Sequence, residues 1–346
     1  MNKKRSAACL YCGTLLRPRK KYCRCGKAVI RCIADRYQLV ELLEIKSRVM
    51  AFRGWDEEDY RPVFIRVALP TAAISEKEGL DVEASLLREM KGNEFFPKHI
   101  SGGRLAETGG LYTVSEFVLG KTLFDAAAEF SPTKKIELAV QVLKPLQAVH
   151  EKHYVVANVC AENFIYTPDG GVKVINLCAA QPSGERSHGK GVEGYKAPEQ
   201  YNYFAEITFA ADVFGVACLF YKLLTGTFPY LAATDKGELF RAGHGPKKTS
   251  LFNKTIIPAI EMALEKALEL DPGIRFRDAG EMKEALWDAF TGSTIVDASG
   301  ITFGRSFMDY LRDIDRKLDN LDSFMDNLVR DWIRRIVLFV KTNILN

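Results

Sequence analysis

The pattern of apolar and polar residues changes near residue 120. Between residues 36 and 118, short apolar runs such as VMAF and LYTVSEFV alternate with polar stretches, which predicts β-strands. Residues 80–91 of this part have apolar positions at helical spacing and predict one short helix. After residue 120 the pattern is mainly helical, and ADVFGVACLFYKLL is apolar on nearly all sides, as in a buried central helix. The sequence thus predicts a strand-rich part followed by a helical part.

Residues that begin helices and turns support this division. Ser131 followed by Pro132 is typical of a helix N-terminus, because Ser caps free backbone amides and Pro suits the first helical position. The stretch NFIYTPDGGVKVIN has two apolar runs around a Pro-Asp-Gly-Gly turn and predicts a β-hairpin.

The C-terminal end has a third pattern. Residues 291–304 contain Gly, Ser and Thr and are predicted to be a linker. Residues 305–346 are predicted to form a long amphipathic helix. Its apolar spacing predicts self-association through a coiled coil of residues 305–332, or else packing on the chain's own body. Residues 332–346 are apolar with basic residues and could contact a membrane surface or a partner, but no apolar run is long enough for a transmembrane span.

Charge is distributed unevenly. The chain has 48 basic and 44 acidic residues, but residues 1–34 contain ten Lys or Arg and no Asp or Glu. This predicts a separate basic module over residues 1–34, attached to an acidic body. The basic residues could balance thiolates at a metal site, or contact nucleic acid or an acidic partner.

The cysteines of this module suggest a metal site. Cys9 and Cys12 form one closely spaced pair and Cys23 and Cys25 a second, each followed by Gly, and four thiolates can hold a tetrahedral structural Zn²⁺. The second pair is C-x-C, so Cys32 is an alternative ligand. The module resembles zinc ribbons of bacterial signalling proteins. Because no secretory signal precedes it, we expect a cytoplasmic protein with reduced or metal-bound thiols.

Several motifs of the body resemble those of protein kinases. They are VHEKHYVVANVCAENFIY, KVINLC, GVEGYKAPEQY, ADVFGVACLFYKLLTGTFPY and LDPGIRFRDAGEM. The body is most similar to bacterial Ser/Thr kinases over residues 36–290. The resemblance implies an α+β fold with two lobes, a β-rich N-lobe at residues 35–118 and a helical C-lobe at residues 119–290.

The resemblance also implies where a nucleotide would bind. The glycine-rich phosphate loop aligns with residues 44–49, which contain no glycine, and Glu44 adds a negative charge there. The strand Lys becomes Arg66, which could pair with Glu83, and the small residue over the base becomes Phe64, which we expect to fill the adenine slot. We therefore predict an impaired nucleotide pocket, formed by Glu44, Lys46, Val49, Phe64, Glu116 and Val118.

The catalytic positions that the resemblance implies are also altered. H-R-D becomes Val-Ala-Asn with Asn158 in place of the base, and an amide cannot take a proton at neutral pH. The catalytic-loop Lys becomes Cys160, and the metal-binding Asp of D-F-G becomes Asn176. Of the family's metal ligands only Asn163 remains, so ATP and Mg²⁺ are not expected.

The bracing residues are retained, in contrast. Glu199, Asp212 and Arg275 stand where the family uses them to hold the helical lobe together. We therefore predict a pseudokinase that is not an enzyme and acts as a scaffold or regulatory protein-binding module. One alternative is an atypical nucleotidyl or residual phosphoryl transferase that reuses Arg66, Glu83, Lys46 and Asn163. The other is a module tethered to nucleic acid through the basic ribbon.

Overall fold

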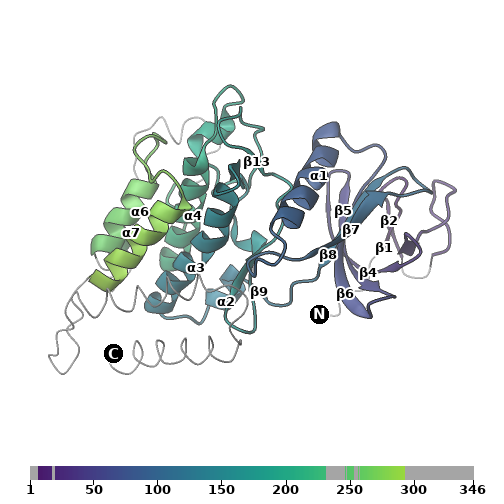
Figure 1. Cartoon of the computed structure of the whole chain (residues 1–346), viewed down its shortest axis with the longest axis horizontal. Coiled ribbons are helices and arrows are strands. Elements are labelled where there is room, and N and C mark those ends of the chain that lie inside the picture. Colours follow the sequence, from purple (N-terminus) through teal and green to yellow (C-terminus); the bar gives the residue numbers. More distant parts are fainter. Residues whose placement is uncertain are drawn as a thin grey trace.

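The computed structural model describes residues 7–17, 20–230, 246, 248–252, 256 and 258–292. Figure 1 shows a β-sheet at one end of the molecule, a helical lobe at the other, and helix α1 (Ile74–Glu89) between them. The predicted coiled coil of residues 305–332, the rest of the segment to residue 346 and nearly all of the linker lie outside the described residues. No helix among the described residues is long and apolar enough to cross a membrane.

The N-lobe is built on one antiparallel sheet of six strands in the order β3-β4-β5-β6-β8-β7. These strands are β3 (Cys32–Ile33), β4 (Tyr37–Lys46), β5 (Val49–Asp56), β6 (Arg61–Ala68), β7 (His99–Arg104) and β8 (Leu111–Glu116). Helix α1 begins with a cap in which the Ala73 amide donates to Glu76 Oε2 at 2.8 Å. The sheet and this helix place Arg66 and Glu83 opposite each other.

The C-lobe is mainly helical. It contains α2 (Leu123–Ala127), α3 (Pro132–His150), α4 (Phe209–Thr225), α6 (Pro258–Ala267) and α7 (Ala279–Gly292). Its short strands are β9 (Lys121–Thr122), β10 (Tyr154–Val155), β11 (Phe164–Tyr166), β12 (Val172–Val174) and β13 (Gln181–Pro182). Ser131 caps α3 by accepting a hydrogen bond from the Lys134 amide at 3.2 Å, and β11 pairs with β12 in the predicted hairpin. Helix α4 is buried along nearly its whole length. The predicted α+β organisation is therefore confirmed.

The N-terminal segment packs on the sheet. It contains two short strands, β1 (Ala7–Ala8) and β2 (Leu15–Leu16), and its side chains Leu10 and Ile33 are fully buried in one apolar cluster with Leu69 and Leu105. Strand β3, which follows the cysteine-containing loops, pairs with β4 as an edge of the sheet. The segment thus shares its apolar core with the N-lobe.

Candidate functional site

A cavity of about 280 Å³ lies between the two lobes. It is lined by Leu43, Phe64, Glu83, Pro97, Ser115, Glu116, Phe117, Val118, Leu119, Gly120, Ile165, Ile175 and Asn176. Five residues singled out in the sequence meet here, and Glu44, Lys46 and Val49 are not among those that line the cavity. Apart from Phe64 and Val118, sequence reasoning missed the apolar contributors, because they come from separate strands and loops and no local pattern marks them.

Glu83, which lines this cavity, forms a buried ion pair with Arg66. Arg66 Nη1 on β6 donates to Glu83 Oε2 on α1, and both side chains are less than a tenth exposed. The other oxygen, Glu83 Oε1, accepts a hydrogen bond from the Leu177 amide at 2.9 Å. Since a buried ion pair needs further hydrogen bonds to offset desolvation, this third partner stabilises the arrangement.

The Cys178 thiol completes this cluster. Its sulfur lies 3.1 Å from Arg66 Nη1 and 3.3 Å from Glu83 Oε2. Burial raises the pKa of the Cys178 thiol, so it remains protonated and can donate to Glu83. Cys178 therefore adds no negative charge to the site.

Phe64 lies beside the ion pair. Its ring lines the cavity, and the guanidinium carbon of Arg66 is 5.0 Å from the ring centroid, within the range of a cation–π contact. Arg66 is thus held between a carboxylate and an aromatic ring, and its charge is already partnered.

The stretch expected to replace the phosphate loop is a tight hairpin. Strands β4 and β5 stay paired up to Lys46 opposite Val49, and Ser47 at the turn has a φ of +52°. The Arg48 amide, at the other turn position, lies 3.4 Å from Glu76 Oε1 at the start of α1. This hairpin offers no glycine backbone for a phosphate group to approach.

The catalytic-loop segment is held by Asp212 of α4. Its carboxylate accepts hydrogen bonds from the Val156 and Ala157 amides at 2.6 and 2.8 Å, and lies 3.0 Å from His150 Nε2. Next in the chain, Asn158 is 6% exposed, and its Oδ1 has no hydrogen-bond partner among the described residues. A buried acceptor of this kind usually accepts a hydrogen bond, because leaving it unpaired is costly.

The two asparagines at the metal-ligand positions bind each other. Asn176 Nδ2 donates to Asn163 Oδ1 at 3.0 Å, and Asn163 Nδ2 donates to the Asn158 carbonyl at 2.8 Å. Asn176 has a φ of +68°, a left-handed conformation that Asn tolerates better than most residues. Nearby, Cys160 is 2% exposed, and burial raises its pKa to about 12, so it is a core thiol.

This donor set does not fit a tightly held Mg²⁺. The two side chains at the ligand positions offer amide oxygens, one of which already accepts a hydrogen bond, whereas Mg²⁺ in proteins is usually held by carboxylates. The carboxylates that line the cavity are Glu83, which is paired with Arg66, and Glu116, which lies 3.5 Å from Lys173 Nζ.

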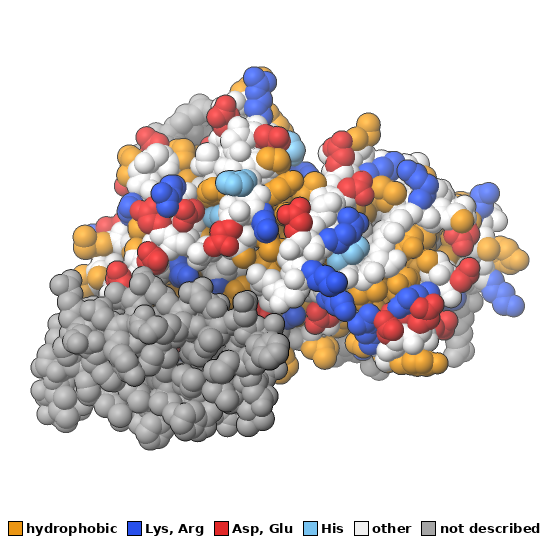
Figure 2. Space-filling model, viewed as in Figure 1, with side chains coloured by type: hydrophobic (Ala, Val, Ile, Leu, Met, Phe, Trp, Pro, Cys, Tyr) orange, Lys and Arg blue, Asp and Glu red, His pale blue; other side chains and the backbone are white. Residues whose placement is uncertain are grey.

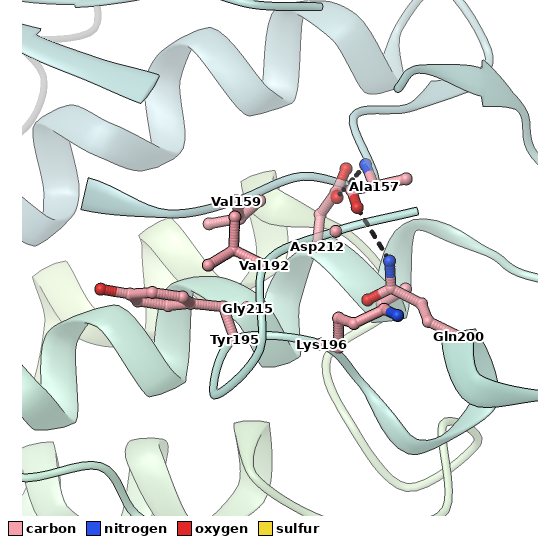
Figure 3. Close-up of a pocket in the computed structure, with 10 residues that line it drawn as sticks. Ala157, Val159, Val192, Tyr195, Lys196, Gln200, Asp212 and Gly215 are labelled. Carbon is pink, nitrogen blue, oxygen red and sulfur yellow. Dashed lines mark hydrogen bonds between the residues drawn. The ribbon is translucent and has the colours of Figure 1, made fainter. Parts of the chain in front are cut away.

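Hydrogen bonds and an ion pair connect the catalytic-loop segment to the helical lobe. Figure 3 shows Gln200 reaching the carbonyl of Ala157, at 2.8 Å, while the Ala157 amide binds Asp212. Arg275 binds both oxygens of Glu199, at 2.7 and 3.0 Å. The loop that carries Asn158 is therefore fixed by the helical lobe.

A second cluster of chemical groups lies in the N-terminal segment. The sulfur atoms of Cys9, Cys12, Cys23 and Cys25 lie within 4.8 Å of one another, and two pairs are 3.6 and 3.7 Å apart. Zn–S bonds of about 2.3 Å in a tetrahedron place sulfurs about 3.8 Å apart, so the four thiols fit one Zn²⁺. Cys32 lies on β3 and is not part of this cluster.

Comparison with known proteins assigns the family. The protein kinase domain matches residues 71–287, which is more than half of the chain, so the chain belongs to the protein kinase family. It is 24% identical over 272 residues to the serine/threonine-protein kinase PknD of Mycobacterium tuberculosis, covering 74% of this chain and 40% of that protein. It is 23% identical over 268 residues to the serine/threonine-protein kinase PknB of Mycolicibacterium smegmatis, covering 73% of this chain and 43% of that protein. The chain thus spans about two fifths of these relatives' length.

These comparisons confirm the predicted kinase-like fold and correct one prediction. The domain match and the relatives named as serine/threonine-protein kinases point to an enzyme, which contradicts our prediction that the chain is not one. The prediction took the substitutions at Arg66, Asn158, Cys160 and Asn176 together as loss of the chemistry, although side-chain identity at these positions does not by itself exclude phosphoryl transfer, which depends mainly on positioning. The structure keeps the frame for such positioning, with the Arg66–Glu83 ion pair formed and the Asn158 loop held by Asp212.

Proposed function

We propose that the chain is a serine/threonine protein kinase-type phosphotransferase in which amides take two positions that the family fills with aspartate. The observation that carries the proposal is the kinase-type frame around the cleft, in which the Arg66–Glu83 ion pair is formed and the Asn158 loop is held by Asp212. Asn158 stands where the family has its base. Its Oδ1 is buried in this structure, so the side chain has to turn towards the cleft before it can accept a hydrogen bond from a Ser or Thr hydroxyl and orient it for attack on phosphorus. The Asp212 clamp holds the loop for this task.

The expected reaction is slow. Phosphoryl transfer depends mainly on positioning and electrostatic stabilisation, so an orienting amide retains part of the catalysis. The amide cannot take the hydroxyl proton, which has to leave to a phosphoryl oxygen or to water. The missing base is expected to cost about 10²- to 10⁴-fold in rate.

The test is transfer of radiolabel from γ-labelled ATP to the chain itself and to a Ser/Thr peptide mixture, with Mg²⁺ or Mn²⁺. Wild type should transfer slowly, Asn158→Ala should lose most of that rate, and Asn158→Asp should gain about 100-fold because a base is restored. Circular dichroism of each variant checks that it is folded. No transfer above background by wild type and by Asn158→Asp would refute the proposal.

We also propose that the four clustered thiols bind one structural Zn²⁺. The support is the spacing of the sulfur atoms and the small size of the segment, which gains folding stability from a metal. Metal analysis of the purified chain should find about one zinc per chain. A chain that is fully folded without any metal would overturn this.

The other functional predictions stay predictions. These are a regulatory or scaffold role towards a protein partner, self-association through residues 305–332, membrane contact by residues 332–346, nucleotidyl transfer, and a cytoplasmic location.

A further inference from the structure

The described part of the N-terminal segment presents a basic surface. Figure 2 shows Lys and Arg side chains projecting at the end of the molecule that carries β1 and β2. The described cations of residues 7–34 are all exposed, and they are Arg17, Lys20, Lys21, Arg24, Lys27 and Arg31. None of them forms an ion pair within the described part of the chain. Even after a zinc tetrathiolate contributes two negative charges, these six cations leave a net positive surface.

The cations are carried by a folded loop with fixed spacing. The Val29 amide donates to the Lys21 carbonyl, and the Cys23 amide to the Lys27 carbonyl, both at 2.9 Å. The Arg31 guanidinium donates to the Lys20 carbonyl at 3.1 Å, which joins the two ends of the loop. The hydrogen bonds of this loop therefore fix the positions of its basic residues, which a flexible basic tail would not do.

An aromatic side chain stands among these cations. Tyr22 is 65% exposed, follows Lys21 directly and precedes the buried Cys23, so its backbone is anchored while its ring faces solvent. Single-stranded nucleic acid is bound by this combination, because cations neutralise phosphates and an exposed ring stacks on an unpaired base. A duplex hides its base faces, and an acidic peptide has no base to stack.

We propose that the loop of residues 20–31 binds single-stranded nucleic acid, with a base stacked on Tyr22 and the Lys and Arg side chains on the phosphates. This proposal is independent of phosphoryl transfer. It uses a surface at the end of the N-lobe that lies away from the helical lobe (Figure 1). It gives the basic segment a binding role beyond balancing thiolates.

The test is fluorescence anisotropy of the full chain with a labelled oligothymidylate of about 16 nucleotides, measured over a range of salt concentrations. Tyr22→Ala should weaken binding about tenfold, whereas Tyr22→Phe should bind like wild type because the ring is kept. The matched control is Tyr60→Ala, which removes another exposed tyrosine, 77% exposed, from the same lobe. It should leave affinity unchanged.

A charge-matched pair tests the phosphate contacts. The double variant Lys20→Ala/Lys21→Ala should reduce the slope of log Kd against log salt by about 1.4. Lys91→Ala/Lys121→Ala removes two exposed lysines elsewhere and should leave the slope unchanged. The proposal would be overturned if Tyr22→Ala bound as well as wild type, or if the two lysine pairs had equal effects. It would also be overturned if a duplex, polyglutamate or anionic vesicles bound as tightly as the single strand.

Discussion

Arg275 is a side chain whose loss should strongly destabilise the helical lobe. It is 4% exposed, binds both oxygens of Glu199, and also donates to the carbonyls of Glu269, Ala210 and Leu270 at 2.6 to 3.0 Å. Replacement by Met keeps much of the volume but leaves the Glu199 carboxylate and three carbonyls without these partners.

The expected loss follows from the burial of this pair. Removing one partner of a buried ion pair costs about 3–5 kcal/mol, because the other charge stays desolvated and unpaired. Against a total stability of about 5–15 kcal/mol for a typical domain, this is about a fifth or more. Urea unfolding followed by far-UV circular dichroism should therefore show a clearly lower midpoint for Arg275→Met.

A nearby arginine provides the control. Arg277 is 83% exposed and pairs with Asp278 at 3.0 Å, an exposed contact of the kind that contributes little. Arg277→Met should leave the midpoint unchanged. Adding Glu199→Gln to Arg275→Met should recover part of the loss, because it removes the stranded charge. If Arg275→Met unfolds at the same urea concentration as Arg277→Met, the reasoning is refuted.

Three further predictions concern other parts of the chain. The Arg36 guanidinium lowers the pKa of Asp56 from 3.8 to about 2, so its stabilisation is present above pH 3.8 and is lost as pH falls through about 2. Asp56→Asn should lower the urea midpoint at pH 7 and flatten its decline between pH 4 and 2, and an unchanged acid titration would contradict this. Asn176→Asp should tighten Mg²⁺ binding measured by calorimetry, because a carboxylate replaces an amide, and equal affinity would argue against this ligand position. Chelation of bound metal should lower the melting temperature, since Leu10 and Ile33 belong to the N-lobe core, and an unchanged transition would show that the thiols need no metal.

Local patterns in the sequence predicted the fold well. The Ser131 cap, the hairpin of β11 and β12 and the buried helix α4 all depend on a few neighbouring residues. The pairing of β3 with β4 was not predicted, because a two-residue strand has no periodicity to detect. The burial of Leu10 against Leu69 was missed for a related reason, since it joins segments far apart in the chain.

The candidate site was predictable only in part. The resemblance to kinases placed Arg66 opposite Glu83, and the structure brings them together. The contact of Cys178 with both of them had no signal in the sequence, since this thiol stands where the family has glycine. The burial of Asn158 Oδ1 without a hydrogen-bond partner among the described residues also had no signal in the sequence, because hydrogen bonding of a buried atom depends on all of its neighbours.

Glu83 connects three parts of the cleft, namely strand β6, helix α1 and the loop after β12. Its two oxygens bind Arg66 on β6 and the Leu177 amide after β12, so strand, helix and loop are fixed through one carboxylate. Helix α1 can lie this close because residue 79 is glycine, where an added Cβ would be 2.5 Å from the Cys178 carbonyl oxygen. The close approach and the ion pair therefore depend on each other. This side of the cleft is thus assembled by the chain's own residues. The amides at Asn158 and Asn176 change the chemistry within a frame that is already in place.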